Sequence, residues 1–365
     1  MDFTFTPEQD DAAALAAQIF ADLTTVERQR SVEAGGDRFD AELWRSVADA
    51  GLISLPIAEE YGGAGLGLIE ASRVLIEAGR TVAPIPLAPV YAAAAVISAY
   101  GSEHQRGRWL PELAAGTAIV VPALAEELDA QPARPTTTAT QGPDGWALTG
   151  TKTVVRAGTH AALFLVTAST PDGAAVFAVS PTAPGVSIEA QRTTDGDLAA
   201  LVTLTNASGE VLGASDAARL LADLVTVTAS AEMVGIAEGS LALTTAYAKE
   251  REQFERPIAT FQSVAHRLAD GHIDILFGSL MLWQAVWRIS EGLDATLEVA
   301  EAALWAADIS HRIAHSTVHI HGGVGIDLDG AAHRYYTAAK RFEFTAGGTT
   351  ASALAVGRLL AAEPA

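Results

Sequence analysis

The chain has 365 residues, of which 49% are hydrophobic and 18% are charged, a composition typical of a folded protein with a large core. Its formal net charge of −21 argues against a nucleic-acid partner, because neutralising phosphates requires clustered Lys and Arg. The absence of cysteine excludes disulfides, thiol nucleophiles and thiolate metal sites.

The N-terminal sequence MDFTFTPEQDDAAA is acidic and lacks the basic region and apolar core of a signal peptide. Charged residues interrupt the Ala-rich runs before they reach the length of a membrane span. We therefore expect a soluble cytoplasmic protein that does not associate with a membrane.

Residues 1–117 show helical periodicity and predict a helical N-terminal domain. Thr6 and Pro7 are typical of a helix start, with a capping residue followed by proline at the first helical position. In FDAELWRSVADAG, the apolar residues gather on one helical face and Gly51 provides a stop.

The periodicity drops to two over residues 118–213, which predicts a β middle domain. Short apolar stretches such as WALTGTKTVVRAG, AALFLVTAS and LAALVTLTN are separated by Gly, Pro, Asp and Asn. Long helical patterns return over residues 214–365 and predict a helical C-terminal domain. The order helical, β, helical indicates an α+β fold.

Two glycine clusters invite comparison with nucleotide-binding motifs. GGAGLGL (62–68) and HGGVGI (321–326) do not fit G-x-G-x-x-G, and neither follows a strand that opens a βαβ unit. The sequence contains no P-loop and no G-x-S-x-G motif. A Rossmann fold is therefore not expected.

Three histidines, His311, His315 and His319, lie at i, i+4 and i+8 on one face of a predicted helix, with Asp308 one turn earlier. Such spacing can hold a metal. However, the chain has no H-E-x-x-H, and ligands along one helix face do not easily surround an ion without another element. We interpret this segment as an ordinary packed helix and predict no metal site.

A polar cluster interrupts the C-terminal helices at REQFERPIATFQ, residues 251–262. Pro257 must end or start a helix there, since it donates no N–H and clashes one turn back. Arg251 and Gln262 therefore flank a corner between two helices. The donor fork of arginine matches phosphate oxygens, and the glycines of HGGVG (321–325) allow close backbone approach to a ligand. Alternatively, Arg251 pairs with a surface carboxylate, Gln262 is solvated and the glycines only cap a helix.

The phrases REQFERPIATFQSVAHRLAD, HGGVGIDLDGAAHRYYTAAK and GLISLPIAEEYGGAGLGL resemble the acyl-CoA dehydrogenases, and the resemblance covers essentially the whole chain. It implies a helical N-terminal domain, a middle domain that is a β-sandwich or barrel, and a C-terminal domain of four-helix-bundle type. It also implies FAD as cofactor and dehydrogenation of acyl-CoA thioesters between Cα and Cβ. In that family a carboxylate takes the α proton, and a hydride passes from Cβ to the flavin.

In tetramers of that family, the corner and the glycine turn reach the FAD of a neighbouring subunit. The resemblance therefore implies that Arg251 and Gln253 meet the pyrophosphate region, and that Phe254 and Gln262 line the cofactor. Three glycines would let the backbone approach the adenosine half of FAD: Gly322, Gly323 and Gly325.

The segments where the family carries its catalytic Glu depart from the pattern. Ala346 falls at the usual position, in FTAGGTT, and Val225 falls at the alternative position in LVTVTA; neither can accept a proton. Glu232 and Glu343 are nearby in sequence, but they lie two turns and about one turn away from those positions. We predict no catalytic residue in this chain.

The middle-domain segments that would hold the chain's own flavin also depart from the family. The T-E-P-x-A-G-S-D loop appears as ALAEELDAQPA (123–133), without its serine and glycine, and the W-I-T/S segment appears as Val154, Val155 and Arg156. The part that binds this subunit's own flavin looks eroded, whereas the part that reaches a neighbour's flavin looks intact.

This asymmetry is similar to the base-lacking subunits of actinobacterial α2β2 acyl-CoA dehydrogenases, which act on CoA thioesters of sterol side chains. The resemblance implies a heterotetramer with a homologous, Glu-bearing partner, a shared acyl-CoA site, and a chain that is inactive alone. Two alternatives stay open, a self-sufficient flavoenzyme with an unrecognised base and a flavin-free scaffold. Apolar residues beyond the needs of one core face also predict an obligate oligomer: Leu276, Leu280, Leu282, Trp283 and Trp287.

Overall fold

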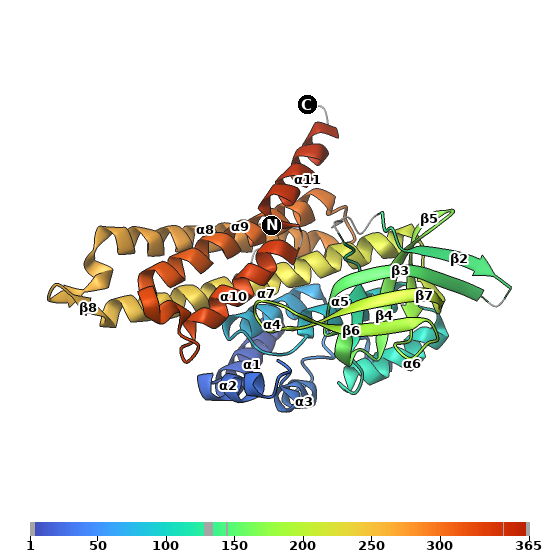
Figure 1. Ribbon diagram of the computed structural model, residues 1–365, viewed down its shortest axis with the longest axis horizontal. Helices are drawn as coiled ribbons and strands as arrows, with labels where there is room; N and C mark the ends of the chain where they lie inside the picture. Colours follow the sequence, from blue (N-terminus) through green and yellow to red (C-terminus); the bar gives the residue numbers. More distant parts are fainter. Residues whose placement is uncertain (1–3, 128–133, 144, 346, 363–365) are drawn as a thin grey trace. The chain divides into compact units, whose positions relative to one another are not determined.

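The computed structural model describes residues 4–127, 134–143, 145–345 and 347–362 (Figure 1). Helices come first: α1 (Pro7–Leu23), α2 (Val26–Ala34), α3 (Ala41–Asp49), η1 (Glu59–Tyr61), α4 (Leu68–Arg80), α5 (Leu87–Tyr100) and α6 (Glu103–Ala114). Strands follow: β1 (Val120–Ala123), β2 (Thr138–Gly142), β3 (Gly145–Arg156), η2 (Gly158–His160), β4 (Leu163–Thr170), β5 (Gly173–Val179), β6 (Val186–Arg192) and β7 (Leu198–Gly213).

Helices then return around one short hairpin: α7 (Ser215–Glu250), β8 (Glu252–Gln253), β9 (Arg256–Pro257), η3 (Ile258–Thr260), α8 (Gln262–Ser290), α9 (Thr296–His321), η4 (Gly322–Ile326), α10 (Ala332–Thr345) and α11 (Gly348–Ala362). The predicted α+β order of helical, β and helical segments is confirmed. At the start of α1, Thr6 and Gln9 form the expected cap, with Pro7 at the first helical position.

The chain forms two compact units. One contains the N-terminal stretch up to Ala34, Ser72–Ala83 and the chain from Ala229 onward; the other contains Gly35–Ala71 and Pro84–Thr228. Two of the limits fall within α4 and α7, and the other two fall directly after α2 and between α4 and α5. The domain boundaries at residues 117 and 213 follow the type of element and stay a prediction.

The strands form a sheet that closes on itself. Among the described residues its order is β1-β4-β2-β3-β7-β5, with β6 paired to β7, and β5 pairs back onto β4. Phe164 of β4 and Phe177 of β5 are fully buried. The β part of the chain is therefore a barrel-like sheet with its own core.

Helices α4 and α7 pack backbone against backbone through glycines. A Cβ at Gly235 would lie 1.9 Å from the carbonyl oxygen of Ile76, and a Cβ at Gly239 would lie 2.2 Å from that of Arg80. In the same way, a Cβ at Gly79 of α4 would lie 2.0 Å from the carbonyl oxygen of Glu232 of α7. Only glycine permits these contacts, because any side chain would push the helices apart.

Among the helices that the structure describes, α7 alone is long and apolar enough to cross a membrane by length and composition, which the interrupted Ala-rich runs did not predict. However, 67% of its apolar window is buried inside the protein. Met233 and Ile236 of α7 pack with Ile309 and Ile313 of α9 in the core of the helical unit. Helix α7 is therefore explained as a core helix.

Candidate functional site

Residues 251–262 form a hairpin corner, hereafter the corner, between α7 and α8. Strands β8 and β9 pair across a two-residue turn, in which Phe254 and Glu255 take left-handed backbone angles (φ 54° and 61°). The amide of Ile258 donates to the carbonyl oxygen of Arg251 at 2.8 Å. The corner expected between two helices is confirmed, whereas the hairpin within it was not predicted.

Most side chains of the corner face solvent. Phe254 is 87% exposed and touches Phe261 edge to face, with 6.2 Å between ring centroids. Within the described parts of the chain, Arg251 has no carboxylate at ion-pair distance, which disfavours the alternative in which it serves a surface ion pair. Its donor fork is therefore available to an anionic ligand, and two amide side chains are exposed nearby: Gln253 and Gln262.

The glycine turn, Gly322–Ile326, follows directly on α9. Gly322 has a φ of 64°, and a Cβ at Gly322 or at Gly323 would meet no atom within 4 Å. These two peptides therefore leave room for a ligand to approach the backbone. Gly325 differs, because it is buried and its Cβ would lie 3.0 Å from the Cα of Val318, so it serves the packing of the turn.

Tyr247 brings the corner and the glycine turn together. The amide of Arg251 donates to the carbonyl oxygen of Tyr247 at 2.8 Å, and the Tyr247 ring stacks on His321 with 4.4 Å between centroids. Burial lowers the pKa of His321, whose Nδ1 donates to the carbonyl oxygen of Thr317 at 2.8 Å. The sequence analysis missed Tyr247, since an aromatic residue in an apolar helix is typical of a core. The available signal was its position one turn before Arg251.

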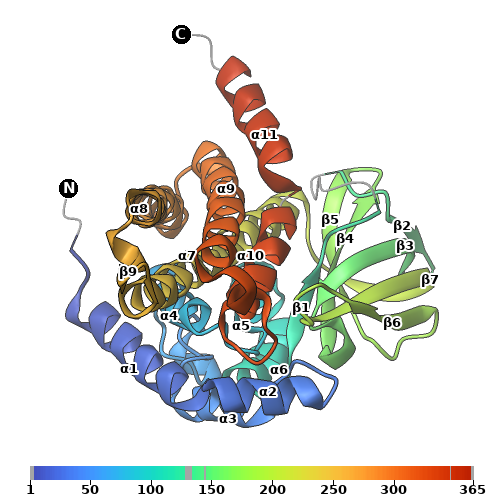
Figure 2. The ribbon, with the colours of Figure 1, turned by 60° about the vertical axis from the view of Figure 1, so that its left-hand side comes forward.

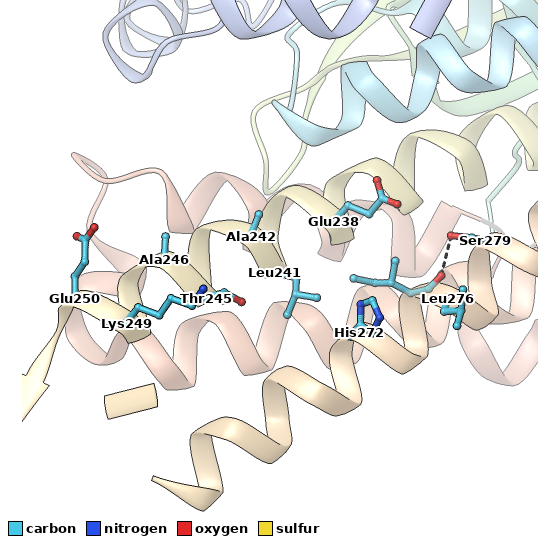
Figure 3. A pocket seen from close by; sticks show the side chains of 11 residues that line it. Glu238, Leu241, Ala242, Thr245, Ala246, Lys249, Glu250, His272, Leu276 and Ser279 are labelled. Carbon is cyan, nitrogen blue, oxygen red and sulfur yellow. Dashed lines mark hydrogen bonds between the residues drawn. The ribbon is translucent and has the colours of Figure 1, made fainter. Parts of the chain in front are cut away.

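A groove of about 640 Å³ runs between the C-terminal half of α7 and the facing side of α8 (Figure 3). Its lining is mainly apolar, and its charged or titratable members are Glu238, Lys249, Glu250 and His272. Because Lys249 and Glu250 immediately precede Arg251, the groove leads into the corner. Along α8 it borders an apolar row, here called the α8 stripe, in which each side chain is about half exposed: Ile273, Leu276, Phe277 and Leu280.

The sequence analysis named five large apolar residues in this region as more than one core face needs, and the structure places them differently. Leu282 has no exposed surface, because it lies on the face of α8 that packs into the chain's own core. Trp283 is partly buried and packs edge to face against Phe5, with 5.0 Å between the ring centroids. Leu276, Leu280 and Trp287 are exposed, as expected of an unfilled interface.

Neither position expected for a catalytic Glu carries a carboxylate. Val225 is an apolar residue within α7, and Ala346 lies outside the described residues. Glu232 of α7 is buried, and its Oε1 lies 3.7 Å from Nη2 of Arg341. Inside the protein, this carboxylate is therefore already paired with the guanidinium of Arg341.

Glu343 belongs to a polar network on α9 and α10. Its Oε2 accepts from Nζ of Lys340 at 2.6 Å and its Oε1 lies 3.0 Å from Nδ1 of His311. Burial alone would raise the pKa of Glu343, but the hydrogen bonds from Lys340 and His311 outweigh it and lower the pKa. The same ammonium group lies 3.2 Å from Nε2 of His315, where a metal would need to bind. This network is suited to neither proton abstraction nor metal binding.

The loop expected to hold the chain's own flavin, residues 123–133, is described only up to residue 127. Glu126 in it is buried and accepts hydrogen bonds from Lys152 at 2.7 Å and from Thr136 and Thr137. Burial opposes the charged form, but the hydrogen bonds, led by that of Lys152, lower the pKa of Glu126 to about 2. Burial lowers the pKa of Lys152, which has no exposed surface. The loop is thus tied to β3 by a buried ion pair.

The segment expected to cover a flavin ring, Val154 to Arg156, lies at an irregularity of β3. The register with β7 shifts between Lys152 and Val155, and Val154 has a φ of 50° and is half exposed. Val155 is buried, and Nε of Arg156 lies 2.8 Å from Oδ2 of Asp197. The segment offers neither the aromatic ring nor the hydroxyl of the family pattern.

Comparison with known proteins agrees with this fold. The acyl-CoA dehydrogenase N-terminal domain matches residues 6–117, and the acyl-CoA dehydrogenase C-terminal domain matches residues 225–359. The chain belongs to the acyl-CoA dehydrogenase family, whose members are FAD-dependent flavoproteins.

Individual relatives are similar over the whole chain. The chain is 40% identical to acyl-CoA dehydrogenase FadE27 of Mycobacterium tuberculosis, over 100% of both proteins. Its structure is similar to a chain of the ChsE4-ChsE5 complex from Mycobacterium tuberculosis, with a TM-score of 0.95, 40% identity and 100% of each chain covered. It is also similar to a chain of a variant of the Tcur3481-Tcur3483 steroid ACAD, with a TM-score of 0.94, 40% identity and coverage of 97% of this chain and 98% of that chain.

The residues of the corner and the glycine turn fit part of an FAD molecule. The exposed guanidinium of Arg251 matches the oxygens of a pyrophosphate, and the bare peptides of Gly322 and Gly323 match a group that approaches the backbone closely. Phe254 adds an exposed ring suited to an apolar or aromatic surface.

Proposed function

We propose that this chain is a subunit of a heteromeric, FAD-dependent acyl-CoA dehydrogenase, and that it completes the FAD site of a homologous partner. Arg251 and Gln253 would bind the pyrophosphate region, Phe254 and Gln262 would line the cofactor, and Gly322, Gly323 and Gly325 would shape the backbone beside its adenosine half. The carrying observation is an assembled, solvent-facing corner in a chain whose expected base positions hold Val225 and Ala346.

The chemistry of the reaction requires a base that this chain does not supply. Removing an α proton from an acyl-CoA thioester needs a positioned acceptor, and a general base contributes about 10² to 10⁴ in rate. Glu232 and Glu343 are both engaged by cationic side chains. The catalytic Glu is therefore assigned to the partner, and the chain alone is expected to be inactive.

The partner is proposed to be a homologous, Glu-bearing chain in an α2β2 assembly. The α8 stripe and the adjoining groove give this chain apolar surface that a second chain would cover. Two neighbours at 40% identity, ChsE4-ChsE5 and Tcur3481-Tcur3483, come from complexes of two proteins, and the second is a steroid ACAD. These relatives favour an acyl-CoA with a sterol side chain as substrate, in a cytoplasmic pathway of steroid breakdown.

Flavin content and mass, measured with and without a Glu-bearing homologous chain, test this proposal. We expect the single chain to hold little flavin and to show background activity, and the pair to form a yellow two-plus-two complex that oxidises acyl-CoA. Changing the partner's Glu to Gln should abolish turnover, whereas Glu343→Gln in this chain should leave turnover within about threefold.

Two results would contradict it. If the purified chain alone reduces flavin with an acyl-CoA substrate and loses this activity in Glu232→Gln or Glu343→Gln, it is a self-sufficient flavoenzyme. If the pair assembles but neither form retains flavin, the chain is a scaffold.

A further inference from the structure

Helix α2 is held by polar contacts rather than by an apolar face. Gln29 is the buried residue of this helix, and its side-chain amide donates to the carbonyl oxygen of Thr81 at 2.6 Å. Two charged residues, Arg30 and Glu33, are three positions apart and so lie on one face. Burial of apolar surface does not account for the position of this helix, whereas contacts of these two side chains do.

Glu33 forms a two-point ion pair with Arg334 of α10. Nε and Nη2 of Arg334 donate to the two carboxylate oxygens at 2.8 and 2.7 Å, and Nη1 donates to the carbonyl oxygen of Gly330 at 2.7 Å. Arg334 is 3% exposed. This fork geometry gives the strongest class of protein ion pair, and it ties α2 to the loop of residues 327–331 that follows the glycine turn.

Arg30 makes a second link to the same loop. Its Nη2 lies 3.2 Å from Oδ1 of Asp329 and also donates to the carbonyl oxygen of Asp329. The amide of Asp329 in turn donates to Oδ1 of Asp327 at 3.0 Å. Two cross-links from one helix face therefore hold the loop, which begins where the glycine turn ends. Figure 2 shows this loop, ahead of α10, beside α2.

We infer that α2 positions the glycine turn for the cofactor, with Glu33 acting through Arg334 as a positioning residue. The inference rests on the proposed function. Much of the turn is open, because Gly322 and Gly323 have open surroundings and Val324 and Ile326 face solvent, as does Leu328 in the loop that follows. A turn that is already held in its binding conformation loses less conformational entropy when FAD binds.

The test compares Glu33→Gln with Glu27→Gln, which changes an exposed carboxylate on the same helix. Hydrogen exchange of the single chain should be about tenfold faster over residues 322–331 in Glu33→Gln and unchanged in Glu27→Gln. FAD should leave the assembled complex about five- to tenfold faster in Glu33→Gln. Glu33→Asp, which keeps the charge, should recover part of both effects.

A purely structural role for the pair predicts a different outcome. Faster hydrogen exchange would then spread over α8 and α9, the melting temperature would fall, and the rate of FAD release would not change. That result would overturn the inference. Unchanged hydrogen exchange in the glycine turn of Glu33→Gln would overturn it as well. Arg251→Ala in the same release assay separates this inference from the proposed function. If Arg251→Ala speeds release and Glu33→Gln does not, only the inference fails, and if neither variant changes release, the proposed FAD site fails with it.

Discussion

Lys152→Met should destabilise the protein, because it leaves the buried carboxylate of Glu126 without its cationic partner. Nζ of Lys152 lies 2.7 Å from Oε1 of Glu126, and Glu126 is only 7% exposed. Removing one partner of such a pair typically costs about 3–5 kcal/mol. Glu126 keeps its hydrogen bonds from Thr136 and Thr137, so we expect a loss near the lower end, about 3 kcal/mol of unfolding free energy.

The double variant Lys152→Met, Glu126→Gln is the matched control. It removes both charges together, so neither partner is left buried as an unpaired ion. Neutral replacement of a buried pair is often close to neutral in stability, and we expect a loss of about 1 kcal/mol. The comparison therefore separates the burial of an uncompensated charge from the mere loss of side-chain contacts.

The stabilising effect of the pair should also depend on pH. The folded chain lowers the pKa of Glu126 from 4.5 to about 2, so the folded state favours its charged form. This contribution is present above the unfolded pKa and is lost as the pH falls through the folded pKa. The difference between wild type and Lys152→Met should therefore shrink between about pH 4.5 and pH 2.

Urea unfolding followed by circular dichroism, at pH 7 and at several acidic pH values, measures these differences through the transition midpoint and slope. A Lys152→Met chain that is within about 1 kcal/mol of wild type at pH 7 would refute the reasoning. A double variant as unstable as the single variant would refute it as well, because the loss would then come from packing.

Three further predictions concern the corner, the helix contact and the interface. Arg251→Ala should weaken FAD retention in the complex by about 1.5–3 kcal/mol, measured as a faster release, and Arg251→Lys should restore it only in part, since the fork is lost. Gly235→Ala should destabilise the chain by about 1–3 kcal/mol in thermal unfolding, whereas Gly357→Ala, where a Cβ meets nothing within 4 Å, should not. Replacing Leu276 and Leu280 by serine should lower the mass of the assembled complex in sedimentation; an intact complex would place the interface elsewhere.

The helical, β and helical order could be predicted because it depends on local periodicity, which each segment carries in its own residues. The corner could be predicted because Pro257 cannot continue a helix. Its hairpin could not, because Phe254 and Glu255 take left-handed angles without the Asn-Gly or Asp-Gly sequence typical of such turns. The roles of the corner came from the resemblance to the family and not from the pattern.

Contacts between residues far apart in the chain could not be predicted from the sequence. Glu33 and Arg334 are 301 residues apart, and a charged pair on two helices looks like solvated surface until the fold brings it together. The place of Leu282 could not be predicted for a related reason. When both faces of a helix are apolar, as in α8, periodicity does not tell which face meets the chain's own core.

The exposed apolar face of α8 should also affect the solubility of the chain on its own. An unassembled chain carries the α8 stripe and Phe254 in water, which favours self-association, while its net charge of −21 makes copies repel one another. This repulsion reaches only about 10 Å at 0.1 M salt and less at higher salt. Chains without a partner should therefore stay monodisperse at low salt concentration and aggregate as the salt concentration rises. In the proposed complex, the ratio in which the two subunits are made, rather than the folding of either, would then set how much of this chain remains in solution.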